Sequence, residues 1–361
     1  MSAQPWLHTL LHRIWSQKGP ISNLLLPLSW LVEQWVKRKE ARFPRHRHAD
    51  DPPGVPVIVV GNILVGGTGK TPVVIALVKA LQQAGYTPGV ISRGYGVRIG
   101  KQPRVFDPGN PGKLSQQVGE VPATLAQSLG DEPALITHST DAPIAVHPRR
   151  LLAAQALRHN CPAVNIIVSD DGLQHLALAR DLEIVVQDDR GIANGRLLPA
   201  GPLREPATRL HQVDVLIHHG PQPAVNTTAS GPLQVHMQLQ PYAVEHVASG
   251  RLITWEQWQH SATNPSRKAT VMAMAAIGNP QRFFSMLTQQ GIALDQTLAL
   301  ADHSHYHPQL LANLTADIIL MTAKDAVKCR AFNDPRLWAV LVEPQFQPSD
   351  WISQLNLKPV N

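Results

Sequence analysis

The chain has 361 residues, a length that fits two domains or one large domain. Apolar residues make up 43% of it and charged residues 16%, so it can bury a core and is not an intrinsically disordered protein. Its two cysteines, Cys161 and Cys329, are too few and too far apart for a disulfide scaffold or a CxxC metal or redox motif. The formal net charge is +6, and no apolar run reaches the roughly 18 residues that a membrane-spanning helix needs.

Residues 1–48 combine tryptophans, apolar stretches and most of the excess positive charge. Four of the eight tryptophans fall within residues 6–35, and six Lys and Arg residues crowd residues 37–47. Aromatic residues and a basic flank on amphipathic helices are typical of segments that lie in a membrane interface. We therefore expect interfacial helices here, although helices packed on the protein body would show the same spacing. No recognition module accompanies the basic cluster, so we expect no nucleic-acid partner.

A β-branched run at residues 55–60 is followed by a glycine-rich loop and then by a helical pattern at residues 73–84. A strand, a loop that ends in Gly-Lys-Thr and a helix form the phosphate-binding P-loop arrangement. The glycines let backbone N–H groups surround phosphate oxygens, and the helix N-terminus adds positive potential. Lys70 would reach the β- and γ-phosphates, and the Thr71 hydroxyl would bind Mg²⁺. The predicted nucleotide-binding residues are Val65, Gly66, Gly67, Thr68, Gly69, Lys70, Thr71 and Pro72.

The loop departs in one place from the common pattern GxxxxGK[ST]. That pattern puts its first glycine at position 64, which is Leu64 in this chain. The loop is thus a variant with Gly66 and Gly67 in its middle. A glycine turn that binds nothing is the alternative, but the strand and the helix both stand where a P-loop needs them.

Two acids follow a second buried strand. Residues 164–169 form another β-branched run, and Asp170 and Asp171 close it. Carboxylates at the C-terminal end of a parallel strand face the nucleotide crevice of an open α/β sheet. We therefore expect Asp170 and Asp171 to join Thr71 in binding Mg²⁺, with a solvated Asp-Gly turn as the alternative.

Several polar residues elsewhere are candidates for the site. Asp131 and Glu132 precede a helical segment, where on their own they would suit an N-cap and a first turn. Arg204 could contact a phosphate or stabilise developing charge, and a structural ion pair explains it equally well. Three histidines alternate over residues 303–307 and could bind zinc from one strand face, but no Cys or Glu partner lies nearby in sequence.

Eight short stretches, taken together, resemble one protein family, tetraacyldisaccharide 4'-kinase, the lipid A 4'-kinase of Gram-negative bacteria. The stretches follow in family order and are residues 61–62 with 65–72, 92–96 (SRGYG), 130–133 (GDEP), 169–175 (SDDGLQH), 198–206 (LPAGPLREP), 276–283 (AIGNPQRF), 302–303 (DH) and 322–328 (TAKDAVK). Leu173 and Ala323 depart from the residues common in the family, and neither would carry chemistry.

The resemblance implies transfer of the γ-phosphate of ATP to the 4'-hydroxyl of an acylated glucosamine disaccharide 1-phosphate in lipid A biosynthesis, with ATP and Mg²⁺ as cofactors. It implies a peripheral protein on the cytoplasmic face of the bacterial inner membrane, in agreement with the expected interfacial helices. It also makes Asp131 the base toward the sugar hydroxyl, with His303 as its dyad partner and Lys70 on the phosphates. Further contacts with the substrate or the transition state are expected from Arg93, Glu132, His175 and Arg204.

The chain as a whole predicts an α/β fold. We expect a P-loop NTPase-like, mostly parallel sheet with helices on both faces, a smaller C-terminal α/β domain and N-terminal interfacial helices. The predicted boundaries are 1–48 for the interfacial helices, 49–220 for the P-loop kinase domain, 221–260 for an antiparallel connector and 261–361 for the smaller domain. Because His303 falls in the last domain, the site would lie in a cleft that closes on ATP.

Two other functions would use the same loop. A membrane-recruited P-loop ATPase switch also combines a Gly-Gly loop with an amphipathic anchor, but it usually carries a lysine at the start of the loop, where this chain has Val65. A soluble small-molecule kinase would share the phosphate-binding groups but not the tryptophan-rich N-terminus. For the kinase, we expect no obligate protein partner beyond the lipid substrate and a membrane surface.

Overall fold

The computed structural model describes residues 14–43, 53–110, 125–220, 231–262, 269–302, 304 and 306–355. The chain forms two compact units, each discontinuous in sequence. Unit 1 comprises Met1–Arg93, His147–Gln238 and Phe346–Asn361, and unit 2 comprises Gly94–Val146 and Leu239–Gln345. These units differ from the consecutive segments predicted above, because compact units follow contacts in space and not the order of the chain.

Unit 1 is built on a parallel sheet with the strand order β8-β7-β6-β1-β5-β2. Its strands are β1 (Val57–Gly61), β2 (Pro88–Ser92), β5 (Ile166–Asp170), β6 (Leu182–Asp188), β7 (Val215–His219) and the first residues of β8 (Leu233–His246). All residues of β1, β2 and β5 are buried, which explains their nearly continuous apolar sequences. In β1, Val60 lies opposite Asp170 of β5, so the loop after β1 and the acids after β5 leave neighbouring strands at the same end.

The helices of unit 1 are α2 (Pro20–Leu24), α3 (Leu26–Arg42), α4 (Lys70–Gln83) and α8 (Arg150–Asn160), together with the 3₁₀ helix η1 (Ala207–His211). Helix α4 packs against β1, β2 and β5, and α8 packs against β2. The buried residues of α4 run from Val73 to Leu81 at helical spacing. The predicted strand, loop and helix are therefore present in the predicted order.

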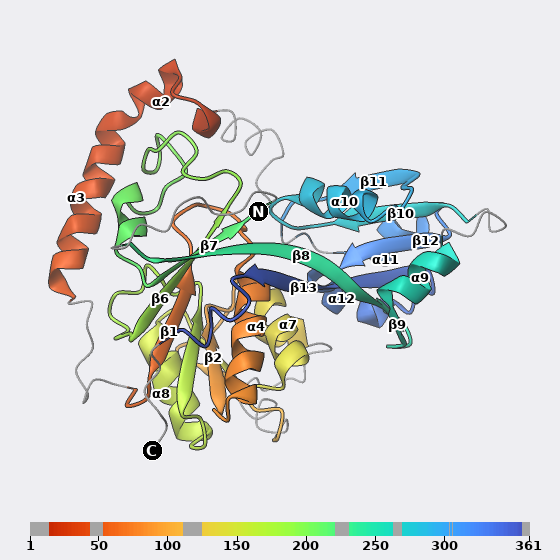
Figure 1. Ribbon diagram of the computed structural model, residues 1–361, viewed down its shortest axis with the longest axis horizontal. Helices are drawn as coiled ribbons and strands as arrows, with labels where there is room; N and C mark the ends of the chain where they lie inside the picture. The colour runs from red at the N-terminus through yellow and green to blue at the C-terminus, as the bar shows by residue number, and fades with distance from the viewer. Residues whose placement is uncertain are drawn as a thin grey trace. The chain divides into compact units, whose positions relative to one another are not determined.

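Helices α2 and α3 are drawn in red in Figure 1. The distribution of their buried and exposed side chains is unusual. Their buried residues are Ser22, Ser29 and Val36. The two serine hydroxyls donate to the carbonyls of Ala200 and Leu197, at 2.6 and 2.8 Å. Large apolar side chains are exposed instead, namely Ile21, Leu24, Leu26, Leu28, Trp30, Leu31 and Trp35. These exposed residues are called the α2–α3 apolar face below. No helix in the described part of the chain is long and apolar enough to cross a membrane.

In unit 2, four neighbouring strands pair in parallel in the order β11-β10-β12-β13. The strands are β10 (Val271–Ala275), β11 (Gln296–Ala299), β12 (Ile318–Thr322) and β13 (Leu337–Gln347). The helices near them in the chain are α9 (Trp255–Ala262), α10 (Pro280–Gln289), α11 (Pro308–Ala312), α12 (Ala323–Cys329) and the 3₁₀ helix η2 (Arg330–Phe332). Alternate residues of β10 enter two different cores: Met272 joins one, and Val271 and Ala273 join the other. The sheet is therefore apolar on both faces, as the prediction of an α/β fold requires.

Residues 94–146 belong to unit 2. They form β3 (Arg104–Phe106), which pairs antiparallel with β4 (Ile144–Val146), and the helices α6 (Leu125–Leu129) and α7 (Asp131–Thr140). Helix α7 packs against α6 and against α12. This contact brings together two segments of the chain that lie almost 200 positions apart and that the sequence analysis treated separately.

The segment predicted as an antiparallel connector is only partly antiparallel. Strand β8, drawn as a long curved strand in Figure 1, pairs in parallel with β7 over Leu233–Met237. It pairs antiparallel with β9 (Leu252–Thr254) at Ala243–Glu245. Alternation of apolar and polar residues reports burial of one strand face, but it carries no information about the direction of the neighbouring strand.

Candidate active site

The glycine-rich loop runs from the end of β1 at Gly61 to the start of α4 at Lys70. Gly66 and Gly69 have φ angles of 94° and 93°, in the left-handed region that side chains other than glycine rarely adopt. Gly69 is also the N-cap of α4, and a Cβ atom there would collide with the ring of His219. The loop thus ends at a helix N-terminus, where unpaired N–H groups and positive potential favour an anion.

Leu64 stands where the common loop pattern has glycine, and its surroundings explain the difference. It is buried and forms an antiparallel bridge with Leu203. The Val65 N–H donates to the Pro202 carbonyl at 3.0 Å, and the Arg204 N–H donates to the Ile63 carbonyl at 2.7 Å. The first part of the loop is therefore extended and paired, so an apolar residue fits where other loops turn. The sequence did not predict that the stretch before Arg204 lies beside this loop.

Lys70, Asp171 and Arg204 meet in unit 1. The Lys70 ammonium lies 3.3 Å from one carboxylate oxygen of Asp171, and the Arg204 guanidinium lies 3.4 Å from the other. Burial by itself would raise the pKa of Asp171, but the charges of Lys70 and Arg204 outweigh it and lower this pKa to about 2. Asp171 is therefore ionised at neutral pH, and in the turn after β5 its carboxylate pairs with two cations.

Asp170 is buried at the end of β5 and accepts a hydrogen bond from the Ser92 hydroxyl at 3.0 Å. Arg150, a buried residue, donates from its guanidinium to the backbone carbonyl of Asp170 at 3.1 Å. Burial lowers the pKa of Arg150 to about 10, so the guanidinium is still charged at neutral pH. Arg150 follows no recognisable motif, and the sequence analysis missed it.

The residues predicted to bind Mg²⁺ carry oxygen donors of the kind that this ion prefers. Asp170 and Asp171 supply carboxylate oxygens at the end of β5, and Thr71 supplies a hydroxyl in the first turn of α4, which packs against β5. Hard oxygen donors of this kind are the ones that Mg²⁺ prefers. In this structure, the two carboxylate oxygens of Asp171 form ion pairs with Lys70 and Arg204.

His175 and Arg93 also belong to unit 1. Burial, together with the charges of Arg150, Lys39 and Arg93, lowers the pKa of His175 to about 4, so its imidazole is neutral at pH 7. Arg93 is exposed directly after β2. Their predicted contacts with substrate stay predictions.

Asp131 and Glu132 lie in unit 2, in the first turn of α7. The N-cap of α7 is Gly130 and no side chain caps this end, so the N-cap interpretation of Asp131 is wrong. The Lys328 ammonium lies 3.0 Å from an Asp131 carboxylate oxygen. Lys324 lies 3.1 Å from Glu132, and although burial alone would lower its pKa, the charges of Glu132 and Asp302 raise it.

Lys324 and Lys328 are one helical turn apart on α12, so they reach the same face of the helix. Each holds one of the two consecutive acids of α7. The four-residue spacing in TAKDAVK is a signal that sequence reasoning had available and did not use, because the partner acids lie almost 200 positions away.

His303 and His305 lie outside the described residues, so the dyad and the zinc alternative stay untested. His307 is exposed before α11. Within the ranges that the structure describes, no group of three His, Cys, Asp or Glu side chains could hold a metal ion.

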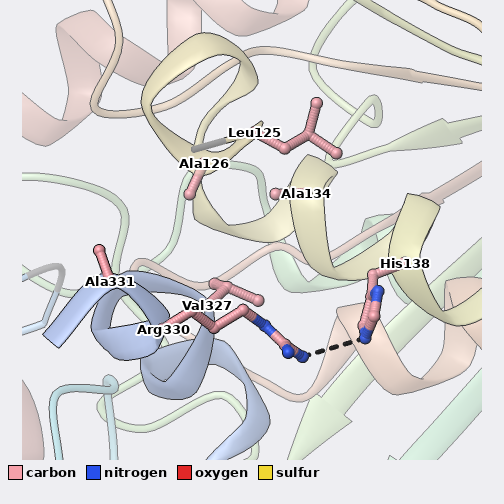
Figure 2. Close-up of a pocket in the computed structure, with 7 residues that line it drawn as sticks. All are labelled: Leu125, Ala126, Ala134, His138, Val327, Arg330 and Ala331. Carbon is pink, nitrogen blue, oxygen red and sulfur yellow. Dashed lines mark hydrogen bonds between the residues drawn. The ribbon is translucent and has the colours of Figure 1, made fainter. Parts of the chain in front are cut away.

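Unit 2 has a cavity of about 430 Å³ that is lined by residues of α6, α7, α12 and η2 (Figure 2). Its lining consists of Leu125, Ala126, Ala134, His138, Val327, Arg330 and Ala331. Arg330 donates to His138 at 3.0 Å, and it also forms a bidentate ion pair with Glu245. The seven lining residues include none of the predicted site residues, so the cavity is distinct from the site described above.

Comparison with known proteins gives a consistent result. A family model described as tetraacyldisaccharide-1-P 4'-kinase matches residues 21–358. The chain is 50% identical over 348 residues to the tetraacyldisaccharide 4'-kinase of Bordetella petrii, an alignment that covers 94% of this chain and 93% of the relative. It is 43% identical over 344 residues to the protein of the same name from Shewanella baltica, with 95% and 93% covered.

Among solved structures, LpxK from Aquifex aeolicus, crystallised in complex with ATP, matches with a TM-score of 0.70 and 24% identity, covering 93% of this chain and 98% of that one. At this identity the likeness supports the fold alone, and it confirms the predicted α/β class. The assignment to a family rests on the sequence matches, which extend over nearly the whole chain. From these matches it follows that the chain belongs to the tetraacyldisaccharide-1-P 4'-kinase family.

Proposed function

We propose that the chain is a lipid kinase that transfers the γ-phosphate of ATP to the 4'-hydroxyl of a tetraacyldisaccharide 1-phosphate. The observation that carries the proposal is the pairing of Lys70 with Asp171 at the N-terminus of α4. A lysine ammonium, a helix N-terminus and strand-end carboxylates are the groups that phosphoryl transfer needs. The Bordetella petrii and Shewanella baltica relatives carry the name of this activity.

The loop and Lys70 bind the nucleotide phosphates in this proposal. The N–H groups of residues 66–70 surround phosphate oxygens, and the Lys70 ammonium exchanges its partner Asp171 for the β- and γ-phosphates. Arg204, which shares Asp171 with Lys70, stabilises the charge that develops on the transferred group. Both cations are therefore prepositioned by one carboxylate before ATP binds.

Thr71, Asp170 and Asp171 are the residues that would hold magnesium. Mg²⁺ bound there supplies positive charge that neutralises the phosphates during transfer. Asp171 is ready for this role because its pKa of about 2 keeps it ionised. Ser92 and Arg150 fix the orientation of Asp170 and of its backbone.

Asp131 accepts the proton of the sugar hydroxyl. The hydroxyl oxygen bonds to the γ-phosphorus as the bond between that phosphorus and the ADP oxygen breaks, and the released proton passes to the Asp131 carboxylate. Lys328 holds this carboxylate on α7 and favours its ionised form. His303 is the proposed partner of Asp131 in a dyad.

The α2–α3 apolar face supports binding to a membrane surface. It includes Trp30 and Trp35, 59% and 60% exposed, and Lys37, Arg38, Lys39 and Arg42 follow on the same helix. Exposed tryptophans next to basic residues suit the interface of an anionic bilayer. We place the protein on the cytoplasmic face of the inner membrane, where its acylated substrate would reside. A soluble small-molecule kinase would have no use for this face.

Incubation of the protein with Mg-ATP and an acylated diglucosamine 1-phosphate tests the proposal directly. Mass spectrometry of the lipid should show one added phosphate, and fragmentation should place it on the sugar that does not carry the 1-phosphate. Lys70→Ala is the matched variant and should lose the product. ATP hydrolysis without phosphate on the lipid would point to the ATPase switch and overturn the kinase proposal.

A further inference from the structure

Four consecutive carbonyl groups of the glycine-rich loop each accept a hydrogen bond from a side chain. Arg190 donates to the carbonyls of Val65 and Gly67, at 3.2 and 3.1 Å. Asn62 donates to the Gly66 carbonyl at 3.1 Å, and His219 bonds the Thr68 carbonyl through Nδ1 at 3.0 Å. Every carbonyl from Val65 to Thr68 is thus held by a side chain, that of Asn62 from within the loop and those of Arg190 and His219 from outside it.

These contacts determine which way the loop N–H groups point. In a trans peptide the C=O of one residue and the N–H of the next point in opposite directions. Side chains that hold the carbonyls of residues 65–68 therefore turn the N–H groups of residues 66–69 away from those side chains. Successive backbone N–H groups that are left free of carbonyl partners can form the concave anion sites found in phosphate-binding loops.

Arg190 and His219 are themselves rigidly placed. Asp188 at the end of β6 and His219 at the end of β7 are register partners in the sheet. The Asp188 carboxylate is fully buried and pairs with Arg190 through Nε at 3.0 Å and Nη2 at 2.9 Å. The His219 ring is 5% exposed and packs directly on Gly69. Two neighbouring strand ends thus present a guanidinium and an imidazole to successive loop carbonyls.

We infer that Arg190 and His219 are positioning residues of the nucleotide site, which hold the peptide planes of the loop in the orientation that binds phosphate. The inference rests on the proposed nucleotide site at residues 65–72. His219 must carry its proton on Nδ1, because only an N–H can donate to the Thr68 carbonyl. A loop oriented before ATP arrives loses less entropy on binding and needs no reorganisation during transfer.

Isothermal titration with ATP and steady-state kinetics test the inference on the full-length protein. Arg190→Ala and His219→Phe should each weaken ATP binding and raise KM for ATP by about tenfold or more, as expected for loss of hydrogen bonds that fix a binding group. KM for the lipid should not change. His219→Asn keeps an N–H donor near the position of Nδ1 and should recover most of the affinity.

Matched control variants separate positioning from general stability. Arg158 also donates to two backbone carbonyls, those of Pro162 and Val164, but far along the chain from the loop. His218 is the neighbour of His219 and bonds the Gln234 side chain instead. Arg158→Ala and His218→Phe should bind ATP as the unmodified protein does, even where their melting temperatures fall.

Three results would overturn the inference. One is unchanged ATP affinity in folded Arg190→Ala and His219→Phe, and another is an equal loss in the two controls. If Arg190→Ala does not fold, Arg190→Lys replaces it, since the single nitrogen of lysine cannot reproduce the planar guanidinium that reaches both carbonyls and the Asp188 carboxylate from three nitrogens. Unchanged affinity in that variant is the third result. Lys70→Ala tests the underlying site: if it leaves both ATP affinity and turnover intact, the nucleotide site itself is misplaced.

Discussion

The Lys328 ammonium lies 3.0 Å from the Asp131 carboxylate, across the contact between α12 and α7. Lys328 also lies 3.5 Å from Asp325, which is fully buried, accepts from the Ala276 N–H and bonds the Thr322 hydroxyl. The position of Lys328 is therefore set by a rigid helix start. Through this lysine, the start of α12 orients the proposed base.

Lys328→Met should lower kcat by about tenfold while leaving KM for ATP unchanged, because the Asp131 carboxylate loses the cation that orients it and favours its ionised form. Lys328→Arg keeps the charge and should retain most of the turnover. Steady-state kinetics with ATP and lipid varied in turn give the comparison. A Lys328→Met enzyme with full turnover would limit the lysine to a role in stability.

Asp131→Asn should lower kcat by at least about 100-fold, because the amide has the same shape as the carboxylate but cannot accept the proton. Glu132→Gln, a change at the neighbouring acid, should lower kcat by a smaller factor than Asp131→Asn does. Single-turnover measurements at saturating ATP and lipid separate the chemical step from binding. Normal turnover of Asp131→Asn would remove this residue from the catalytic step.

Lys70→Met should change the pH dependence of stability in a defined direction. The pKa of Asp171 is about 2 in the folded protein, against an ordinary value of 3.8 for an aspartate. Its ion pairs therefore stabilise the fold above pH 3.8, and this stabilisation is lost as the pH falls toward 2. Because Lys70 is the largest favourable charge on Asp171, removing it should lower the unfolding free energy at pH 5 to 7 and have less effect near pH 3.

Urea unfolding across this pH range provides the measurement. A difference between Lys70→Met and the unmodified protein that stays constant down to pH 3 would contradict the role of Lys70 in keeping Asp171 ionised.

The lowered pKa of His175 predicts that the folded protein loses stability in weak acid. The pKa of His175 is about 4 in the folded protein, against an ordinary value of 6.5 for a histidine. Between these two pH values the unfolded chain therefore binds a proton that the folded protein excludes. The unfolding free energy should therefore fall as the pH drops from about 6.5 to 4, and His175→Gln should reduce this slope. His260→Gln, at an exposed position of α9, is the control and should leave the slope unchanged.

Trp30→Ser combined with Trp35→Ser should weaken binding to vesicles that contain anionic lipid by about tenfold or more, because two large apolar side chains no longer enter the interface. Tyr242→Ser removes an aromatic side chain that is 46% exposed outside the α2–α3 apolar face, and it should leave binding unchanged. Flotation of the three proteins with the same vesicles measures the difference. Equal flotation of all three would argue against this face as the membrane contact.

The amino-acid sequence by itself determined the features that depend on neighbouring residues. The β-branched run before Gly61, the glycines that adopt positive φ and the apolar spacing of α4 are local properties, so strand, loop and helix were predicted in place. The acids after β5 were found for the same reason. The order of short motifs was sufficient for the family, because each motif can be recognised without its partners.

Only the tertiary structure decided which side chains meet. Arg150, Arg190 and His219 follow no local pattern, yet each contacts a predicted site residue or the predicted loop from a distant segment. The burial of Ser22 and Ser29 and the exposure of Trp30 and Trp35 likewise depend on carbonyls near residue 200. Such contacts arise from strand register and helix packing, which place residues together that local sequence patterns describe only separately.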